Sequence, residues 1–522
     1  MQTNDQSQAL ACLAAAVDPM GQPPQRIDTV GAVLFCTRQR VLKLKRAVRY
    51  AFLDHLSVDT RRTACVAELH LNRRTAPALY RGVRALLPSP HGAVLTPLDP
   101  TGDQAYPDAI DWVVEMAWFE ATFDELALSG TLTLGLLKAA VDPIAAFHRA
   151  LPPVAGDGAA AVARVVEINR RAFNDLPPGA LDPAAVADLL ATTDQTLATV
   201  RTILDHRCDR GWMRHCHGDL HLGNLCLFDG EPLAFDALEF SVDLATTDVL
   251  YDIAFLVMDL IHRGMAEYAA WTLNRWCDLV PTGGDAFAVW PLFLSLRAAV
   301  RAHVEARRGG DHAVAAEDYL TLARKALQPP TPGLVAVGGF SGTGKTQLAL
   351  RLAPALTGAG GARHLRSDVV RKQLAGVSPE TRLPADAYHA AASGQVFATL
   401  ADSAAEVLQS GWPVVVDAVF AREDERSLLE GVAAKAGVPF HGLWLEAPVA
   451  LRQERCATRH HDASDADGAV TARQEGYDLG TLTWQRIDAT GTPDSVLTNA
   501  LTALGLHLVG PPTPDCSPRQ VS

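Results

Sequence analysis

The chain has 522 residues, 48% of them hydrophobic and 20% charged, with 46 basic against 59 acidic side chains. This length exceeds one ordinary core and suggests roughly two or three globular domains. The net charge of −13 argues against non-specific binding to nucleic acid or to an anionic membrane. The nine cysteines form no CxxC pair and no uncharged apolar run reaches about 18 residues, so we expect a cytoplasmic protein without a membrane span.

The N-terminal segment, residues 1–24, has a short apolar run with no basic stretch before it. It predicts a helical extension and not a signal peptide. In residues 29–45, β-branched and aliphatic side chains flank a break near 37–40, so two strands are expected.

Lys43 and Lys45 alternate with apolar residues in the second of these strands and share one face. Either lysine is a candidate for the α- and β-phosphates of ATP, and a solvated strand face is the alternative. Glu68, in the helix expected at 59–75, is the ion-pair partner of that lysine, a surface charge, or a partner of the nearby Arg73 and Arg74. No GxGxxG loop precedes the lysines.

An apolar strand is expected at 110–119, followed by helices at 134–150, 159–173 and 184–208. Apolar residues recur in these helices at helical spacing, which is typical of a core. The last helix leads into the segment 217–224, HGDLHLGN.

Asp219 and Asn224 in this segment have the spacing of a kinase catalytic loop. In such a loop the aspartate accepts the proton of the substrate hydroxyl and the asparagine holds Mg²⁺. Asp236, after a predicted hairpin, is a candidate second metal ligand. The alternatives are a turn role for Asp219 and a zinc cluster formed by Cys216 and the neighbouring histidines, although zinc spacing explains neither Asn224 nor Asp236.

Asp252 opens an apolar helical run and is either a helix cap or a brace for the catalytic loop. Further on, the proline-rich stretch 328–333 interrupts the helical pattern and indicates an interdomain linker.

A second phosphate site follows the linker. The pattern GxxxxGK[ST] lies between an apolar strand at 334–337 and a helix, the context that a P-loop requires. Its amides and helix N-terminus would cradle phosphates, with Lys345 on the β- and γ-phosphates and Thr346 on Mg²⁺. The residues expected to contact the nucleotide are Gly339, Gly342, Thr343, Gly344, Lys345, Thr346 and Gln347.

Three features beyond this loop carry further expectations. Asp368 begins a helix and is either the base for the acceptor hydroxyl or, like Ser367, a helix cap. Asp417 ends a buried strand, where an acid would help to hold Mg²⁺. Arg455 and Arg459 share a helix face with Arg452 and predict a lid over the transferred phosphoryl group.

These motifs resemble known families. HGDLHLGN followed by FDALEF resembles the catalytic segment of aminoglycoside phosphotransferases and choline kinases, which have a protein-kinase-like fold. RSD, VVVDA, EAP and DASDAD resemble small P-loop kinases of the gluconate kinase, chloramphenicol phosphotransferase and zeta toxin group. The whole chain resembles a bacterial fusion described as a bifunctional aminoglycoside phosphotransferase and ATP-binding protein.

The resemblance implies that Asp219 is the base and that Asn224 and Asp236 hold Mg²⁺. It also implies that His217 shapes the loop and that the backbone near 115–117 contacts adenine.

We therefore predict an α+β protein-kinase-like bilobal domain followed by an α/β P-loop domain with a parallel sheet. The expected divisions are a helical extension at 1–24, a kinase-like domain at 25–326, a linker at 327–332, a P-loop kinase domain at 333–508 and a disordered tail at 509–522. The predicted function is transfer of the ATP γ-phosphate, with Mg²⁺, to hydroxyl groups of small molecules. The alternatives are a nucleotide-gated regulator with one silent module, or RNA-end or nucleotide kinase activity in the P-loop half.

Overall fold

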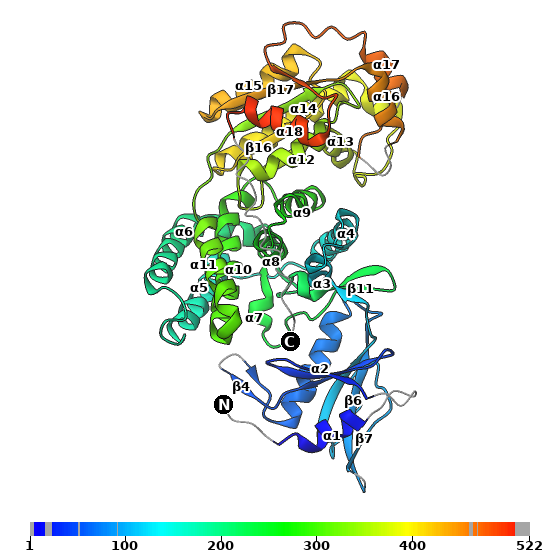
Figure 1. Cartoon of the computed structure of the whole chain (residues 1–522), viewed down its shortest axis with the longest axis vertical. Coiled ribbons are helices and arrows are strands. Elements are labelled where there is room, and N and C mark those ends of the chain that lie inside the picture. Colours follow the sequence, from blue (N-terminus) through cyan, green and yellow to red (C-terminus); the bar gives the residue numbers. More distant parts are fainter. Residues whose placement is uncertain are drawn as a thin grey trace. The chain divides into compact units, whose positions relative to one another are not determined.

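The computed structural model describes residues 5–15, 23–50, 53–90, 92–458, 463–466 and 468–506. Its contacts divide the chain into two compact units. The first consists of Met1–Val165 and Leu204–Leu256, and the second of Val166–Ile203 and Val257–Ser522 (Figure 1). The predicted boundaries at 25–326 and 333–508 divide the chain elsewhere and stay a prediction.

The first unit contains a six-stranded antiparallel sheet in the order β1-β2-β3-β8-β6-β7. The strands are β1 Gln25–Asp28, β2 Ala32–Cys36, β3 Val41–Lys45, β6 Tyr80–Ser89, β7 Gly92–Leu95 and β8 Asp111–Met116. Helix α1 (Ser7–Ala15) buries Leu13 against one set of strand side chains, and α2 (Val58–Asn72) buries Leu69 against another. The two strands expected at 29–45 are therefore confirmed as β2 and β3.

Residues 217–224, the predicted catalytic segment, connect β10, which pairs with β13, to β11 of the sheet β12-β11-β9. The strands are β9 Ala121–Thr122, β10 Met213–His215, β11 Leu225–Phe228, β12 Glu231–Ala234 and β13 Thr246–Asp248. The short helices are α3 Phe123–Leu128, η1 Leu222–Asn224 and α7 Val242–Ala245. The long helices are α4 Leu134–Ala150, α5 Gly158–Asn174, α6 Pro183–Asp209 and α8 Val249–His262.

The second unit contains a five-stranded sheet in the order β15-β16-β14-β17-β18, and every pairing in it is parallel. The strands are β14 Leu334–Gly339, β15 Arg363–Arg366, β16 Val414–Asp417, β17 Phe440–Glu446 and β18 Gln485–Asp488. The helices are α12 Lys345–Leu356, α13 Ser367–Leu374, α14 Ala390–Gln409, α15 Glu423–Ala436, α16 Val449–Ala457, α17 Gly468–Gln474 and α18 Pro493–Ala503. The predicted parallel sheet is confirmed.

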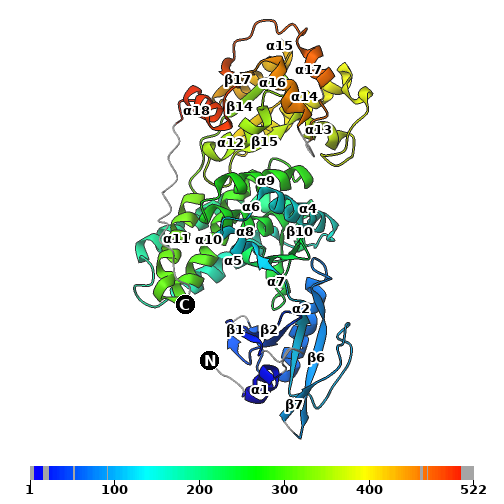
Figure 2. The ribbon, with the colours of Figure 1, turned by 45° about the vertical axis from the view of Figure 1, so that its right-hand side comes forward.

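The second unit also contains α9 Ala266–Leu279, α10 Ala286–Arg308 and α11 Ala313–Ala326, together with most of α6 and parts of α5 and α8. Helix α9 runs alongside α12 (Figure 2), and Ala270 shares one hydrophobic core with Val335 of β14 and Leu352 of α12. The expected linker lies between α11 and β14. The hydrophobic core of the parallel sheet therefore includes a residue that precedes this linker in the sequence.

The predicted tail at 509–522 lies outside the described residues. Within the described part of the chain, no helix has the length and apolar character needed to cross a membrane.

Candidate functional sites

Both lysines of β3 contact Glu68 of α2. Lys43 Nζ lies 2.8 Å from Glu68 Oε1 and 2.5 Å from Asp236 Oδ1. Lys45 Nζ lies 2.5 Å from Glu68 Oε2 and also pairs with Glu239. Glu68 and both lysines are buried, which rules out a solvated strand face and a surface charge. Burial alone raises the pKa of Glu68, but the two ammonium groups lower it below its ordinary value.

The side chains of Asp219 and Asn224 meet in the catalytic segment. Asn224 Nδ2 donates hydrogen bonds to Asp219 Oδ2 at 2.9 Å and to Asp219 O at 2.8 Å. A carboxamide nitrogen only donates hydrogen bonds and Mg²⁺ takes oxygen ligands, so Oδ1 is the Asn224 atom that can serve as a Mg²⁺ ligand. Phe235 N donates to Asn224 O at 3.0 Å, and Asp236 follows with a φ of 59°. A main-chain hydrogen bond thus connects Asn224 to the residue before Asp236, the second predicted metal ligand.

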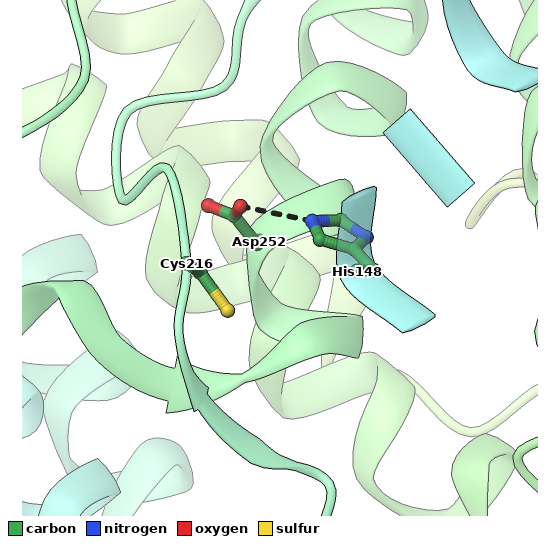
Figure 3. Close-up of side chains that lie close together, drawn as sticks. All are labelled: His148, Cys216 and Asp252. Carbon is green, nitrogen blue, oxygen red and sulfur yellow. Dashed lines mark hydrogen bonds and ion pairs between the residues drawn. The ribbon is translucent and has the colours of Figure 1, made fainter. Parts of the chain in front are cut away.

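Asp252, in the first turn of α8, holds the start of this segment. Its Oδ2 accepts a hydrogen bond from His217 N at 3.0 Å and lies 3.1 Å from His148 Nε2, and its Oδ1 accepts one from Gly218 N at 2.9 Å. Figure 3 shows His148 and Cys216 beside the carboxylate, and all three side chains are buried. Because main-chain donors engage both oxygens, the geometry favours the predicted brace over a helix cap or a metal site.

The zinc cluster considered for the sequence neighbours does not form. His217 Nε2 lies 3.0 Å from Phe235 O, and His221 Nδ1 accepts a hydrogen bond from Gly223 N at 3.1 Å. In the described part of the chain, the one group of three possible metal ligands is the set around Asp252. Burial lowers the pKa of His217 below its ordinary value.

The loop between β14 and α12 depends on glycine. Gly339, Gly342 and Gly344 have φ values of 140°, 83° and 92°, where other residues are strained. A Cβ on Gly342 would also lie 2.3 Å from Arg452 O. The main chain therefore makes a turn that few other residues allow.

Side chains of the loop turn back on its own main chain. Thr343 Oγ1 and Lys345 Nζ donate to Phe340 O at 2.8 and 3.1 Å. Gln347 is exposed in the first turn of α12. The predicted contacts of these residues with a nucleotide stay a prediction.

Asp417 and Thr346 meet at the carboxyl end of the parallel sheet. Thr346 Oγ1 donates to Asp417 Oδ2 at 2.5 Å, and His364 Nε2 of β15 lies 3.5 Å from the same oxygen. Burial alone raises the pKa of Asp417, but His364 and the nearby cations lower it to about 2. An ionised carboxylate and a hydroxyl are ligands that fit Mg²⁺.

Asp368 lies in the first turn of α13. The N-cap position is Arg366, whose side chain makes no capping hydrogen bond, so neither Ser367 nor Asp368 occupies the cap. Burial raises the pKa of the Asp368 carboxyl. A general base works best with a pKa closer to neutral, so this environment suits the predicted role.

Arg452, one of the three arginines of the predicted lid, contacts the phosphate loop. This side chain is buried at 2% exposure, with its guanidinium 5.3 Å from the ring of Phe340. Its Nη1 donates to Ser341 O at 3.5 Å, and its place in a lid stays a prediction. Arg455 Nη1 donates to Ala489 O at 2.9 Å, and its nucleotide contact stays a prediction. Arg459 lies outside the described residues.

Residues 334–477 match the family model described as an AAA domain. Together with the parallel sheet and the glycine-dependent loop, this match gives the second unit a P-loop fold. Uncharacterized proteins of Mycobacterium bovis and Mycobacterium tuberculosis are 29% identical to the chain over 488 residues, covering 89% of this chain and 92% of each relative.

Three solved kinase structures are similar to parts of the chain. A gluconokinase from Sinorhizobium meliloti has 21% identity and a TM-score of 0.25, covering 34% of this chain and 93% of its own. A Mycobacterium tuberculosis APS kinase in complex with AMPPNP and APS has 20% identity and a TM-score of 0.27, covering 34% and 99%. A choline/ethanolamine kinase family protein from Mesorhizobium loti has 13% identity and a TM-score of 0.37, covering 62% and 95%.

Sequence reasoning missed His364 and His148. Strand alternation places His364 on the same face as Arg366, just ahead of Asp368, which is a signal that could have been read. His148 lies on the apolar face of a helix that was assigned entirely to the core. Only its contact with Asp252 distinguishes it from a core residue.

Proposed function

We propose that this protein is an ATP-dependent phosphotransferase with two nucleotide sites, each transferring the γ-phosphate to a hydroxyl group of a small molecule. One kind of observation carries the proposal in both sites: a side chain predicted to bind phosphate or metal contacts the acid predicted to bind Mg²⁺. In the first site Lys43 Nζ contacts Asp236. In the second site Thr346 Oγ1 donates a hydrogen bond to Asp417.

In the first site, Lys43 holds the phosphates, and Asn224 Oδ1 with Asp236 would hold Mg²⁺. Bound Mg²⁺ supplies charge neutralisation on the phosphate oxygens. Asp219 accepts the proton of the acceptor hydroxyl, and Asn224 fixes the orientation of its carboxylate.

In the second site, the loop amides and Lys345 bind the phosphates, and Thr346 with Asp417 would hold the metal. Asp368 takes the proton of the second acceptor. Its raised pKa and its position at the carboxyl end of the sheet support this role.

The test uses purified Asp219→Asn, Lys345→Ala and the double variant with radiolabelled ATP and a panel of hydroxylated metabolites. Each single variant is expected to lose about 10²- to 10⁴-fold in transfer to one set of acceptors and to keep the other. Asp243→Asn, which changes an exposed acid on α7, is the control and is expected to behave as wild type.

Unchanged transfer in both single variants, with ATP still bound, would favour a nucleotide-gated regulator. Loss in only one of them would identify one silent module.

A further inference from the structure

The free edge of the parallel sheet is covered by a side chain of α9. Strand β15 is an outer strand, paired only with β16 in the described sheet. Arg363 N donates to Pro413 O at 3.0 Å on the β16 side, so Ala362 O and His364 N face away from the sheet. Edge groups of this kind need partners when they are buried.

Asn274 of α9 provides both partners. Its Nδ2 donates to Ala362 O at 3.0 Å, and its Oδ1 accepts a hydrogen bond from His364 N at 2.7 Å. A carboxamide offers the same donor and acceptor that a neighbouring strand would offer. Asn274 is 3% exposed, so losing either bond would leave a buried polar group unpaired.

Other contacts fix the position of α9 relative to β15. Arg363 Nη2 lies 2.6 Å from Asp278 Oδ1, and its Nη1 donates to Asn274 Oδ1 at 3.0 Å. Where the chain enters β15, a Cβ on Gly361 would lie 2.6 Å from Ala270 Cβ. The helix therefore cannot shift without moving the strand.

His364 connects α9 to the phosphate site. Its backbone is bound to Asn274, and its imidazole Nε2 lies 3.5 Å from Asp417 Oδ2. That oxygen also accepts the hydrogen bond of Thr346 Oγ1. At 1% exposure the imidazole is a buried neighbour of the carboxylate and favours the orientation that turns Oδ2 towards Nε2.

We propose that His364 and Asn274 are positioning residues for the Asp417 carboxylate, which makes α9 a functional part of the P-loop site. The inference rests on the proposed function, because it takes Asp417 as a Mg²⁺ ligand. Side chains that orient a metal ligand change metal affinity by about 10- to 100-fold when they are removed.

The test uses the full chain in an Asp219→Asn, Asp236→Asn background, so that ATP binding and turnover report the P-loop site. ATP is titrated by calorimetry at a series of Mg²⁺ concentrations. His364→Leu is expected to raise the Mg²⁺ concentration for half-maximal ATP binding by about 10-fold or more. His364→Gln keeps a hydrogen-bond donor, so its Mg²⁺ concentration for half-maximal ATP binding is expected to stay within about 3-fold of wild type. In Asn274→Leu this concentration is expected to rise, as in His364→Leu.

Gln373→Ala is the matched control, because it removes a hydrogen bond from α13 to Asp278 O of α9 without touching β15. It is expected to leave the Mg²⁺ midpoint unchanged. An unchanged midpoint in His364→Leu, or a lower Tm without a shifted midpoint in Asn274→Leu, overturns the inference.

Lys345→Ala in the same background distinguishes a failure of the proposed P-loop site from a failure of the positioning role of His364. If it abolishes ATP binding while His364→Leu shifts nothing, only the positioning role fails. If ATP binding and turnover survive Lys345→Ala, the proposed second site fails, and the inference fails with it.

Discussion

Asp417 of the P-loop site is buried and Asp368 is partly buried, and their pKa values move in opposite directions. Burial raises the pKa of Asp368, whereas His364 and nearby cations outweigh burial at Asp417 and lower its pKa to about 2. Environments that separate two carboxyl groups in this way are typical of sites that assign them different roles. This difference supports the proposed roles, proton transfer for Asp368 and Mg²⁺ binding for Asp417.

This difference predicts a stability effect of Asp368→Asn. Because the folded pKa is raised, the fold favours the protonated carboxyl, and this stabilisation is lost as the pH rises through the folded pKa. At pH 7 the variant should therefore melt higher, by on the order of 2 °C, and the gain should vanish below the ordinary aspartate pKa of about 3.9. Differential scanning calorimetry from pH 3.5 to 7.5 would measure it.

The same variant should lose about 10²-fold or more in P-loop turnover. Asp402→Asn, on the exposed face of α14, is the control for an added amide. A more stable variant with unchanged turnover would assign Asp368 a purely structural role.

At the scale of elements, the phosphate loop is held between its own glycines and α16. Arg452 O lies where a Cβ of Gly342 would go, while a Cβ of Gly344 would meet no atom within 4 Å. Both residues have a positive φ. An alanine at position 344 would therefore suffer backbone strain alone, whereas an alanine at position 342 would suffer both strain and a steric clash.

Gly344→Ala is expected to cost about 1 kcal/mol of unfolding free energy, from strain alone. Gly342→Ala should cost about 2–4 kcal/mol, because the loop or α16 must also move. Chemical denaturation without nucleotide measures both and keeps phosphate contacts out of the comparison. Equal losses would mean that α16 yields freely and that Arg452 does not support the loop.

At the scale of the whole molecule, the compact units do not follow the sequence motifs. Helices α9 to α11 precede the proline-rich linker, yet Ala270 lies in the core of the P-loop sheet. Trp290 of α10 is fully buried, and its Nε1 donates to Ala359 O at 2.7 Å. A cut at the linker would expose these contacts.

We therefore predict different stabilities for two fragments. The fragment 328–506 should be less stable than the fragment 266–506, which keeps α9 to α11, by about 3 kcal/mol or more, because it exposes apolar surface and unpairs the edge of β15. Thermal melting and binding of a hydrophobic dye would compare them. Equal melting temperatures would show that the P-loop sheet folds without α9.

The sequence predicted those features whose signals are local. The strand, glycine turn and helix of the P-loop are contiguous, and the spacing of Asp219 and Asn224 lies within one loop. Strand β6 was missed, because Gly82 and Pro88 obscure its alternation and pairing with β8 defines it. The choice between Lys43 and Lys45 also could not be made, since both point to one face.

By itself, the sequence determined two phosphate-site motifs, the parallel sheet and the helix that follows the glycine-rich loop, because hydrophobic period and turn chemistry depend on neighbouring residues. Only the tertiary structure decided that Asp252 braces the catalytic segment, that Arg452 is buried, and that α9 completes the edge of β15. These contacts join residues far apart in the chain. Their energies come from burial and from paired polar groups, which no local pattern encodes.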